Sequence, residues 1–97
     1  MQMDKKFKEP DNTAVFTTKF VVEDNKDITT VFHYEDGDWQ FSSNDMVDNF
    51  EEVARIVGLG EIISLDESVL QIADLPEGYA AQRRFKNDAW KISLMPE

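Results

Sequence analysis

Residues 35–38, Glu-Asp-Gly-Asp, separate two segments in which apolar and polar residues alternate. Alternation with a period of two is typical of a β-strand with one buried face. Because Asp-Gly accepts the positive φ angles of a tight type I′ turn, the sequence predicts a hairpin between residues 28–34 and 38–43. In this hairpin we expect four aromatic residues to share the side that faces the core: Phe32, Tyr34, Trp39 and Phe41.

Further strands are predicted on both sides of a short helical region. Residues 14–22 and 53–57 are rich in β-branched or aromatic residues, which favours strands, whereas 43–52 is open between a loop and a short helix. Beyond Gly60, apolar residues three and four positions apart predict two short helices. Asp66 is expected to cap the second helix, and Pro76 with Gly78 to end it. Two closing strands are predicted over residues 79–85 and 89–94.

This order of elements predicts an α+β domain. We expect a small antiparallel sheet of about five to six strands, with two short helices between the N-terminal strands and the C-terminal strand pair. The predicted structural core comprises the four hairpin aromatics together with Ile62, Leu70, Leu75 and Trp90.

The length of the chain, 97 residues, suits one domain. Residues 1–12 are polar and are predicted to form a loose N-terminal arm, and 13–95 to form a single globular domain. The absence of cysteine excludes disulfides and thiolate zinc sites. No apolar run reaches the ~20 residues of a membrane helix, and no secretory signal is evident, so we expect a cytoplasmic protein.

Charge is distributed unevenly along the chain. The net charge is −10, and residues 23–77 carry fifteen acids and two bases, a segment charge of −13. Such a field repels nucleic acids and anionic membranes, and we expect neither as a partner. It attracts a basic protein and accelerates its association at low salt. The alternative is that the charge serves solubility alone.

Candidate site residues follow from this charge and from the few residues that could carry chemistry. The predicted partner-binding residues are Asp36, Asp38, Asp45, Asp48, Glu51 and Glu52. The lone histidine, His33, and Arg83 are the candidates for a small-ligand site, and imidazole could act there as a base because it titrates near neutrality. The aspartate spacing does not match a calcium loop, and no catalytic residue, metal site or cofactor is predicted. Arg83 and its neighbour Arg84 are expected to neutralise acids of their own domain, with one side chain pointing outward and the other inward.

Several motifs together resemble a known family. They are Asp-Trp-Gln-Phe at residues 38–41, Leu-Gly-Glu-Ile at 59–62, Leu-Pro-Glu-Gly-Tyr-Ala-Ala-Gln-Arg at 75–83, and Trp90. The chain resembles, over about residues 28–92, a family of small uncharacterised bacterial proteins with these motifs, which implies no particular activity. More distantly it is similar to small acidic immunity-like proteins of polymorphic-toxin systems, from which it departs between Asp45 and Val57. That resemblance implies a protein that neutralises a toxin.

The sequence is therefore compatible with three functions. The first is an acidic protein-binding domain, of the immunity type in its most specific form, that docks a basic toxin or similar partner. The second is a ligand-binding protein or enzyme that uses His33 and neighbouring acids. The third is a structural domain that oligomerises through an exposed edge of its sheet.

Overall fold

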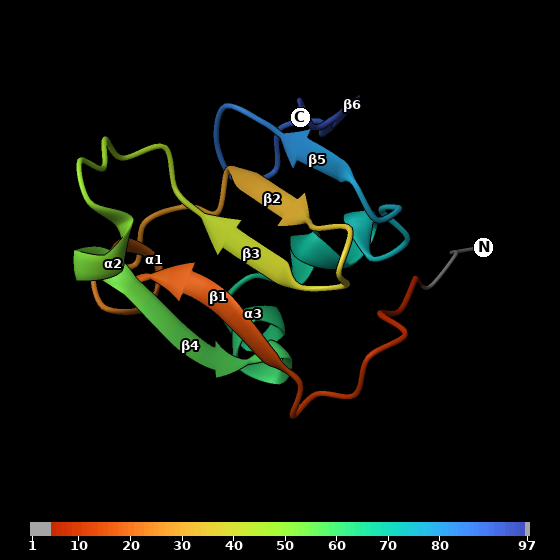
Figure 1. Cartoon of the computed structure of the whole chain (residues 1–97), viewed down its shortest axis with the longest axis horizontal. Helices are drawn as coiled ribbons and strands as arrows, with labels where there is room; N and C mark the ends of the chain where they lie inside the picture. The colour runs from red at the N-terminus through yellow and green to blue at the C-terminus, as the bar shows by residue number, and fades with distance from the viewer. Residues whose placement is uncertain (1–4, 97) are drawn as a thin grey trace.

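The computed structural model describes residues 5–96 and contains one six-stranded sheet, with α3 and the 3₁₀ helix that follows it packed on one side (Figure 1). The strand order is β4-β1-β3-β2-β5-β6. The strands are β1 (Ala14–Thr18), β2 (Thr30–His33), β3 (Trp39–Ser42), β4 (Ala54–Gly58), β5 (Tyr79–Gln82) and β6 (Lys91–Leu94). The helices are α1 (Lys19–Val22), α2 (Phe50–Val53), α3 (Leu59–Leu65) and the 3₁₀ helix η1 (Glu67–Ile72).

The α+β class is confirmed, with α3 and η1 between the first four strands and the closing pair β5 and β6. Four of the five strand pairs are antiparallel, and β1 and β3 are parallel. The strand expected over residues 14–22 ends at Thr18, where the chain turns into α1. This turn buries Val21, which is 2% exposed, so packing overrides the β propensity of the segment. Residues 43–49 are a loop, and Asn49 caps the single turn of α2.

The hairpin of β2 and β3 forms, but its turn has three residues, whereas the predicted type I′ turn at Asp36-Gly37 has two. The Tyr34 N–H donates to the Asp38 carbonyl, and the Gly37 N–H to the Tyr34 carbonyl, which encloses residues 35–37 in a three-residue turn. Gly37 has φ 95°, as expected for a type I turn followed by a bulge. His33 therefore lies opposite Trp39, and Phe32 opposite Gln40.

This shift corrects the prediction for Phe32 and Tyr34. Side chains alternate between the two faces of a strand, so a one-residue change of register exchanges the faces. Val31 and His33 point into the core beside Trp39 and Phe41, whereas Phe32 and Tyr34 are half-buried on the opposite face.

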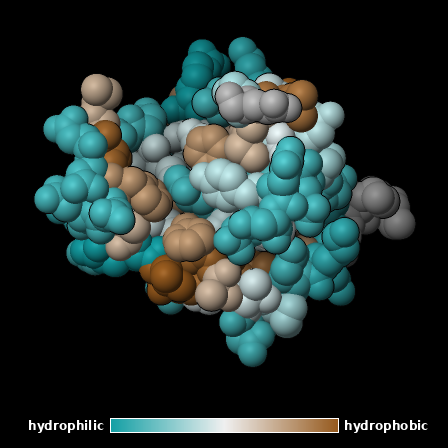
Figure 2. Space-filling view, viewed as in Figure 1, coloured by the Kyte–Doolittle hydropathy of each residue, from teal (hydrophilic) through white to brown (hydrophobic). Residues whose placement is uncertain are grey.

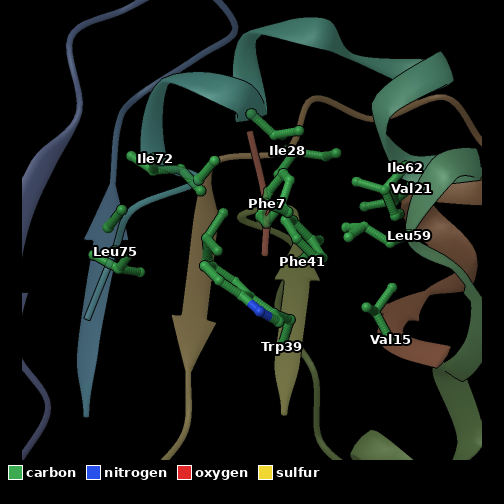
Figure 3. Close-up of a cluster of buried hydrophobic side chains, with 14 residues drawn as sticks. Phe7, Val15, Val21, Ile28, Trp39, Phe41, Leu59, Ile62, Ile72 and Leu75 are labelled. Carbon is green, nitrogen blue, oxygen red and sulfur yellow. The ribbon is translucent and has the colours of Figure 1, made fainter. Parts of the chain in front are cut away.

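The core lies between the sheet and the layer formed by α3 and η1 (Figure 3). Four of the predicted core residues are buried in it: Trp39, Phe41, Ile62 and Leu75. Leu70 and Trp90 are partly buried and pack against this cluster. The expected N-cap is also present, because the Asp66 carboxylate accepts the backbone N–H of Ser68 at the start of η1.

The N-terminal segment is not a loose arm over residues 5–12, and residues 1–4 of that prediction lie outside the described part. Phe7 is 9% exposed and belongs to the core. Its ring meets Trp39 edge-on, with the ring centroids 4.9 Å apart. The carboxylate of Glu9 accepts the indole N–H of Trp39 at 3.1 Å, and the Asp11 carbonyl accepts the backbone N–H of Gly60. This segment therefore closes one side of the domain.

Candidate functional site

The sheet has one face that the helical layer does not cover, which we call the open face. Figure 2 looks onto it and shows apolar side chains gathered at its centre and toward α2 and β4, surrounded by hydrophilic ones. The strand registers place on this face side chains that are half-buried or exposed: Phe16, Thr30, Phe32, Tyr34, Gln40, Ser42, Ile56 and Gln82. An aromatic surface that is left uncovered is typical of an interaction site.

A groove of about 480 Å³ crosses the open face between the sheet and the loop that precedes α2. Three phenylalanines line it, Phe20, Phe32 and Phe50. Asp45 and Asp48 also line it. The remaining lining residues are Thr18, Thr30, Gln40, Ser42, Ser43, Val47 and Gln82. The groove thus combines an apolar surface with negative charge and hydrogen-bonding groups.

The polar groups of the open face are connected in a row along β2 and β3. The Tyr34 hydroxyl donates to the side-chain oxygen of Gln40 at 2.9 Å, and the Gln40 amide donates to the Ser42 hydroxyl at 3.0 Å. The Phe32 and Tyr34 rings stack at 5.8 Å. Burial raises the pKa of the Tyr34 hydroxyl, and the negative charge of Asp36 adds to this effect. Tyr34 therefore stays neutral at physiological pH and orients Gln40.

The six predicted partner-binding acids lie in two separate groups. Asp45 and Asp48 line the groove, and the Asp45 carboxylate accepts the Ser43 hydroxyl at 2.7 Å. Glu51 and Glu52 are exposed in the first turn of α2, which follows the same loop. Asp36 and Asp38 lie in the hairpin turn, at the opposite end of β3 (Figure 1). The Asp36 carboxylate accepts the Asp38 N–H at 3.0 Å, so Asp36 stabilises the turn.

His33 is buried in the core and does not line the groove. It is 4% exposed, and its ring stacks on Trp39 with a centroid distance of 3.8 Å. Its Nδ1 lies 2.7 Å from the Leu75 carbonyl oxygen, which can only accept, so Nδ1 carries the proton. The other ring nitrogen, Nε2, is buried and has no hydrogen-bond partner within residues 5–96. These contacts give His33 a structural position.

Arg83 is also buried, in a pair with Asp66. One guanidinium nitrogen, Nη2, donates to the Asp66 carboxylate at 2.8 Å, and Nε donates to the Ile28 carbonyl at 3.0 Å. The guanidinium carbon lies 4.0 Å from the centroid of the Trp90 ring. His33 pairs with Tyr79 at the start of β5, whereas Arg83 directly follows the end of this strand. Four residues of strand span about 13 Å, so the structure does not bring His33 and Arg83 together.

Arg84 points outward, as predicted for one of the two arginines, and pairs with Asp88 at 3.0 Å. The hydrogen bonds that the Arg84 guanidinium and its backbone N–H donate lower the pKa of Asp88 from 3.8 to about 2.

This pair predicts a change in acid stability. A carboxyl whose pKa is lower in the folded state stabilises that state above its unfolded pKa, and this contribution is lost as the pH falls from about 4 to about 2. We expect Asp88→Asn to flatten the dependence of unfolding free energy on pH in this interval, measured by urea denaturation at successive pH values. Arg84→Met should flatten it in the same way. An unchanged slope in both variants would contradict the prediction.

Within residues 5–96, no three His, Cys, Asp or Glu side chains are arranged to hold a metal ion. In the same range, none of the helices has the length and apolar character needed to span a bilayer. Comparisons with family models, with curated proteins and with solved structures found no match for this chain.

The apolar part of the groove was not predicted from the sequence. The alternation in the sequence places Phe32 in the core, and Phe20 and Phe50 are not among the predicted site residues. A signal existed at Phe50, because it follows four acids and amides in a segment with few other large apolar residues. The position of Phe32 depends on the length of the hairpin turn, which the sequence pattern does not determine.

Proposed function

We propose that this protein is a protein-binding domain that docks a basic partner in the groove of the open face. The observation that supports this most directly is that three phenylalanines and two aspartates, Asp45 and Asp48, line one groove. Aromatic rings attract cations at their faces, and carboxylates form charge-assisted hydrogen bonds with them. An arginine or lysine side chain of a partner can make both contacts at once.

The charge of the whole chain supports the same partner chemistry. The segment of charge −13, residues 23–77, contains most of the groove and both groups of acids. A basic protein is steered toward such a surface, and its association slows as salt screens the field. The apolar residues of the open face then supply the buried centre that a stable interface requires.

A narrower form of this proposal is an immunity-type protein. It draws on the similarity of the Trp-x-Phe segment at residues 39–41 and of the segment ending at Arg83 to immunity-like proteins of polymorphic-toxin systems. In this form the partner is a toxin domain with a basic surface, and occupation of the groove neutralises it. The test is the growth of cells that express a toxin encoded beside this gene. Rescue by this chain, and loss of rescue when it carries Asp45→Asn with Asp48→Asn, supports the narrower form. Cell death even with the unaltered chain contradicts it.

The general proposal predicts that neutralising the groove weakens binding of a basic probe. We expect Asp45→Asn with Asp48→Asn to raise the dissociation constant of a hexa-arginine peptide by about tenfold, because each exposed ion pair contributes about 0.5–1 kcal/mol. The peptide is titrated into isotopically labelled protein, and amide chemical shifts give both the affinity and the location. Shifts should concentrate on Phe32, Gln40 and Ser42.

A matched control separates the groove from a general charge effect. Glu61→Gln with Glu67→Gln removes the same charge from exposed positions in α3 and η1, on the other side of the sheet. This variant should change the dissociation constant by less than about twofold. Equal weakening in both variants, or shifts spread over all acidic surfaces, would show that the groove is not the binding site.

A further inference from the structure

A second surface, independent of the groove, lies at β6, which is the outermost strand of the sheet on that side. All four of its residues are exposed. Ile92 and Leu94 stand opposite Ala81 and Tyr79, so they are on the face that carries the helical layer. That layer does not reach them, and they remain 51% and 67% exposed.

Among the described residues, 5–96, the outer edge of β6 has no paired strand. The Met95 N–H donates to the Gly78 carbonyl at 2.9 Å, which continues the register that pairs Leu94 with Tyr79. Bonded and non-bonded pairs alternate in an antiparallel ladder, so Ser93 and Lys91 bond to β5. The backbone N–H and C=O groups of Ile92 and Leu94 therefore point away from the sheet. Within residues 5–96 no strand pairs with them.

A second groove, of about 490 Å³, lies on the same side of the sheet beside β6. It is mostly apolar, and Ile92 of β6 lines it together with Ile72, Leu75, Pro76 and Trp90. The open edge thus combines unpaired backbone groups with an uncovered apolar surface. Edges of this kind are the positions at which another strand adds to a sheet.

We infer that the β6 edge binds the β6 edge of a second copy of this chain, in an antiparallel pair around a two-fold axis through Ser93. In this register Ile92 of one copy lies opposite Leu94 of the other, and both residues exchange their free backbone hydrogen bonds. The two exposed apolar side chains of each copy cover those of its partner. Such a self-complementary patch is what a two-fold dimer requires.

Charge favours a second copy at this edge over the rest of the surface. β6 carries one charged residue, Lys91, and no acid, whereas residues 23–77 carry a segment charge of −13, so two copies repel each other least at this edge. Two copies that meet at β6 keep their −13 segments apart, and Lys91 falls opposite Met95 rather than another charge. An edge of four residues buries less than the ~1,000 Å² of a stable interface, so the dimer is weak, with a dissociation constant in the micromolar-to-millimolar range.

The first test is the association state of the full chain as a function of concentration and salt, measured by sedimentation equilibrium. We expect a monomer–dimer equilibrium that strengthens with added salt, because screening reduces the repulsion between two bodies of charge −10. Binding of a basic partner in the groove responds to salt in the opposite direction. Leu94→Lys should abolish dimerisation, and it places a charge at an exposed position that the fold does not need.

The second test locates the two-fold axis through cross-linking. The chain has no cysteine, so Ser93→Cys introduces a single thiol. A non-hydrogen-bonded pair brings the two Cα atoms to about 4.5 Å, within reach of a disulfide. An added oxidant that accepts two electrons should convert this variant to a covalent dimer.

Lys91→Cys is the matched control, since it lies on the same exposed strand but its two copies are about 13 Å apart in this register. It should cross-link at least tenfold more slowly than Ser93→Cys. Equal rates for the two variants would overturn the register and with it the proposal. A chain that stays monomeric at all concentrations and salts would overturn it as well, and would leave the edge to a strand of another protein.

Discussion

Replacing Arg83 with methionine is expected to destabilise the fold by about 3–5 kcal/mol, as is typical when one partner of a buried ion pair is removed. The Arg83 side chain is fully buried and that of Asp66 is 5% exposed, so the substitution leaves a buried carboxyl group without the cation that pairs with it. Domains of this size are stable by only about 5–15 kcal/mol. The midpoint of urea denaturation, followed by Trp fluorescence, should therefore fall steeply.

Two further variants separate the buried charge from other losses. Arg84→Met removes the same kind of side chain from the neighbouring position, which is 80% exposed, and should cost less than about 1 kcal/mol. Arg83→Met combined with Asp66→Asn should recover part of the loss, because asparagine is neutral and still caps η1. If Arg83→Met costs no more than Arg84→Met, the buried pair does not stabilise the domain.

Local sequence signals predicted the elements well where their chemistry is local. The hairpin and the cap at Asp66 each depend on residues a few positions apart, and both are present. The predicted helix end at Pro76 and Gly78 is wrong, because η1 already ends at Ile72. The strand predicted from residue 53 is found as β4. Such signals give the order of strands and helices, from which the α+β class follows.

The assignment of faces could not be predicted in the same way. Asp36-Gly37 fits a two-residue turn and, equally, a three-residue turn with glycine at the bulge, and only the second is present. Both faces of β2 carry large side chains, so its composition does not decide between the two registers. The choice comes from the core, in which Trp39 packs against His33 and Phe7.

The candidate site shows the same division. The acids around the groove could be chosen from charge alone, and two of them, Asp45 and Asp48, line it. The separation of Asp36 and Asp38 from this group requires knowledge of the strand directions. The burial of His33 also depends on the register. In the predicted register, which follows from a two-residue turn, the His33 side chain would have faced outward.

The N-terminal segment illustrates a limit of composition. Residues 1–12 include only one aromatic residue among charged and polar ones, which is typical of an unpacked terminus. A single large side chain can nevertheless fix such a segment when the core has a gap of the right shape. Phe7 lies over Trp39 and Phe41 beneath the helical layer (Figure 3).

Replacing Phe7 with alanine is accordingly expected to destabilise the fold by about 3–5 kcal/mol, the usual cost of a phenyl ring lost from a core. Its ring contacts Trp39 and Phe41, and its removal would leave a cavity between the sheet and the helices. Urea denaturation measures the loss. Trp fluorescence of the folded state should also shift to longer wavelength as water reaches Trp39.

The control for this prediction is the neighbouring exposed residue. Lys8→Ala, one position away, should change the unfolding free energy by less than about 0.5 kcal/mol, as surface substitutions usually do. If Phe7→Ala and Lys8→Ala lower the unfolding free energy equally little, the N-terminal segment only lies along the surface and does not contribute to the core. A large loss confined to Phe7→Ala would instead show that a terminus of polar composition supplies the side chain that holds Trp39 in the stacked position against His33.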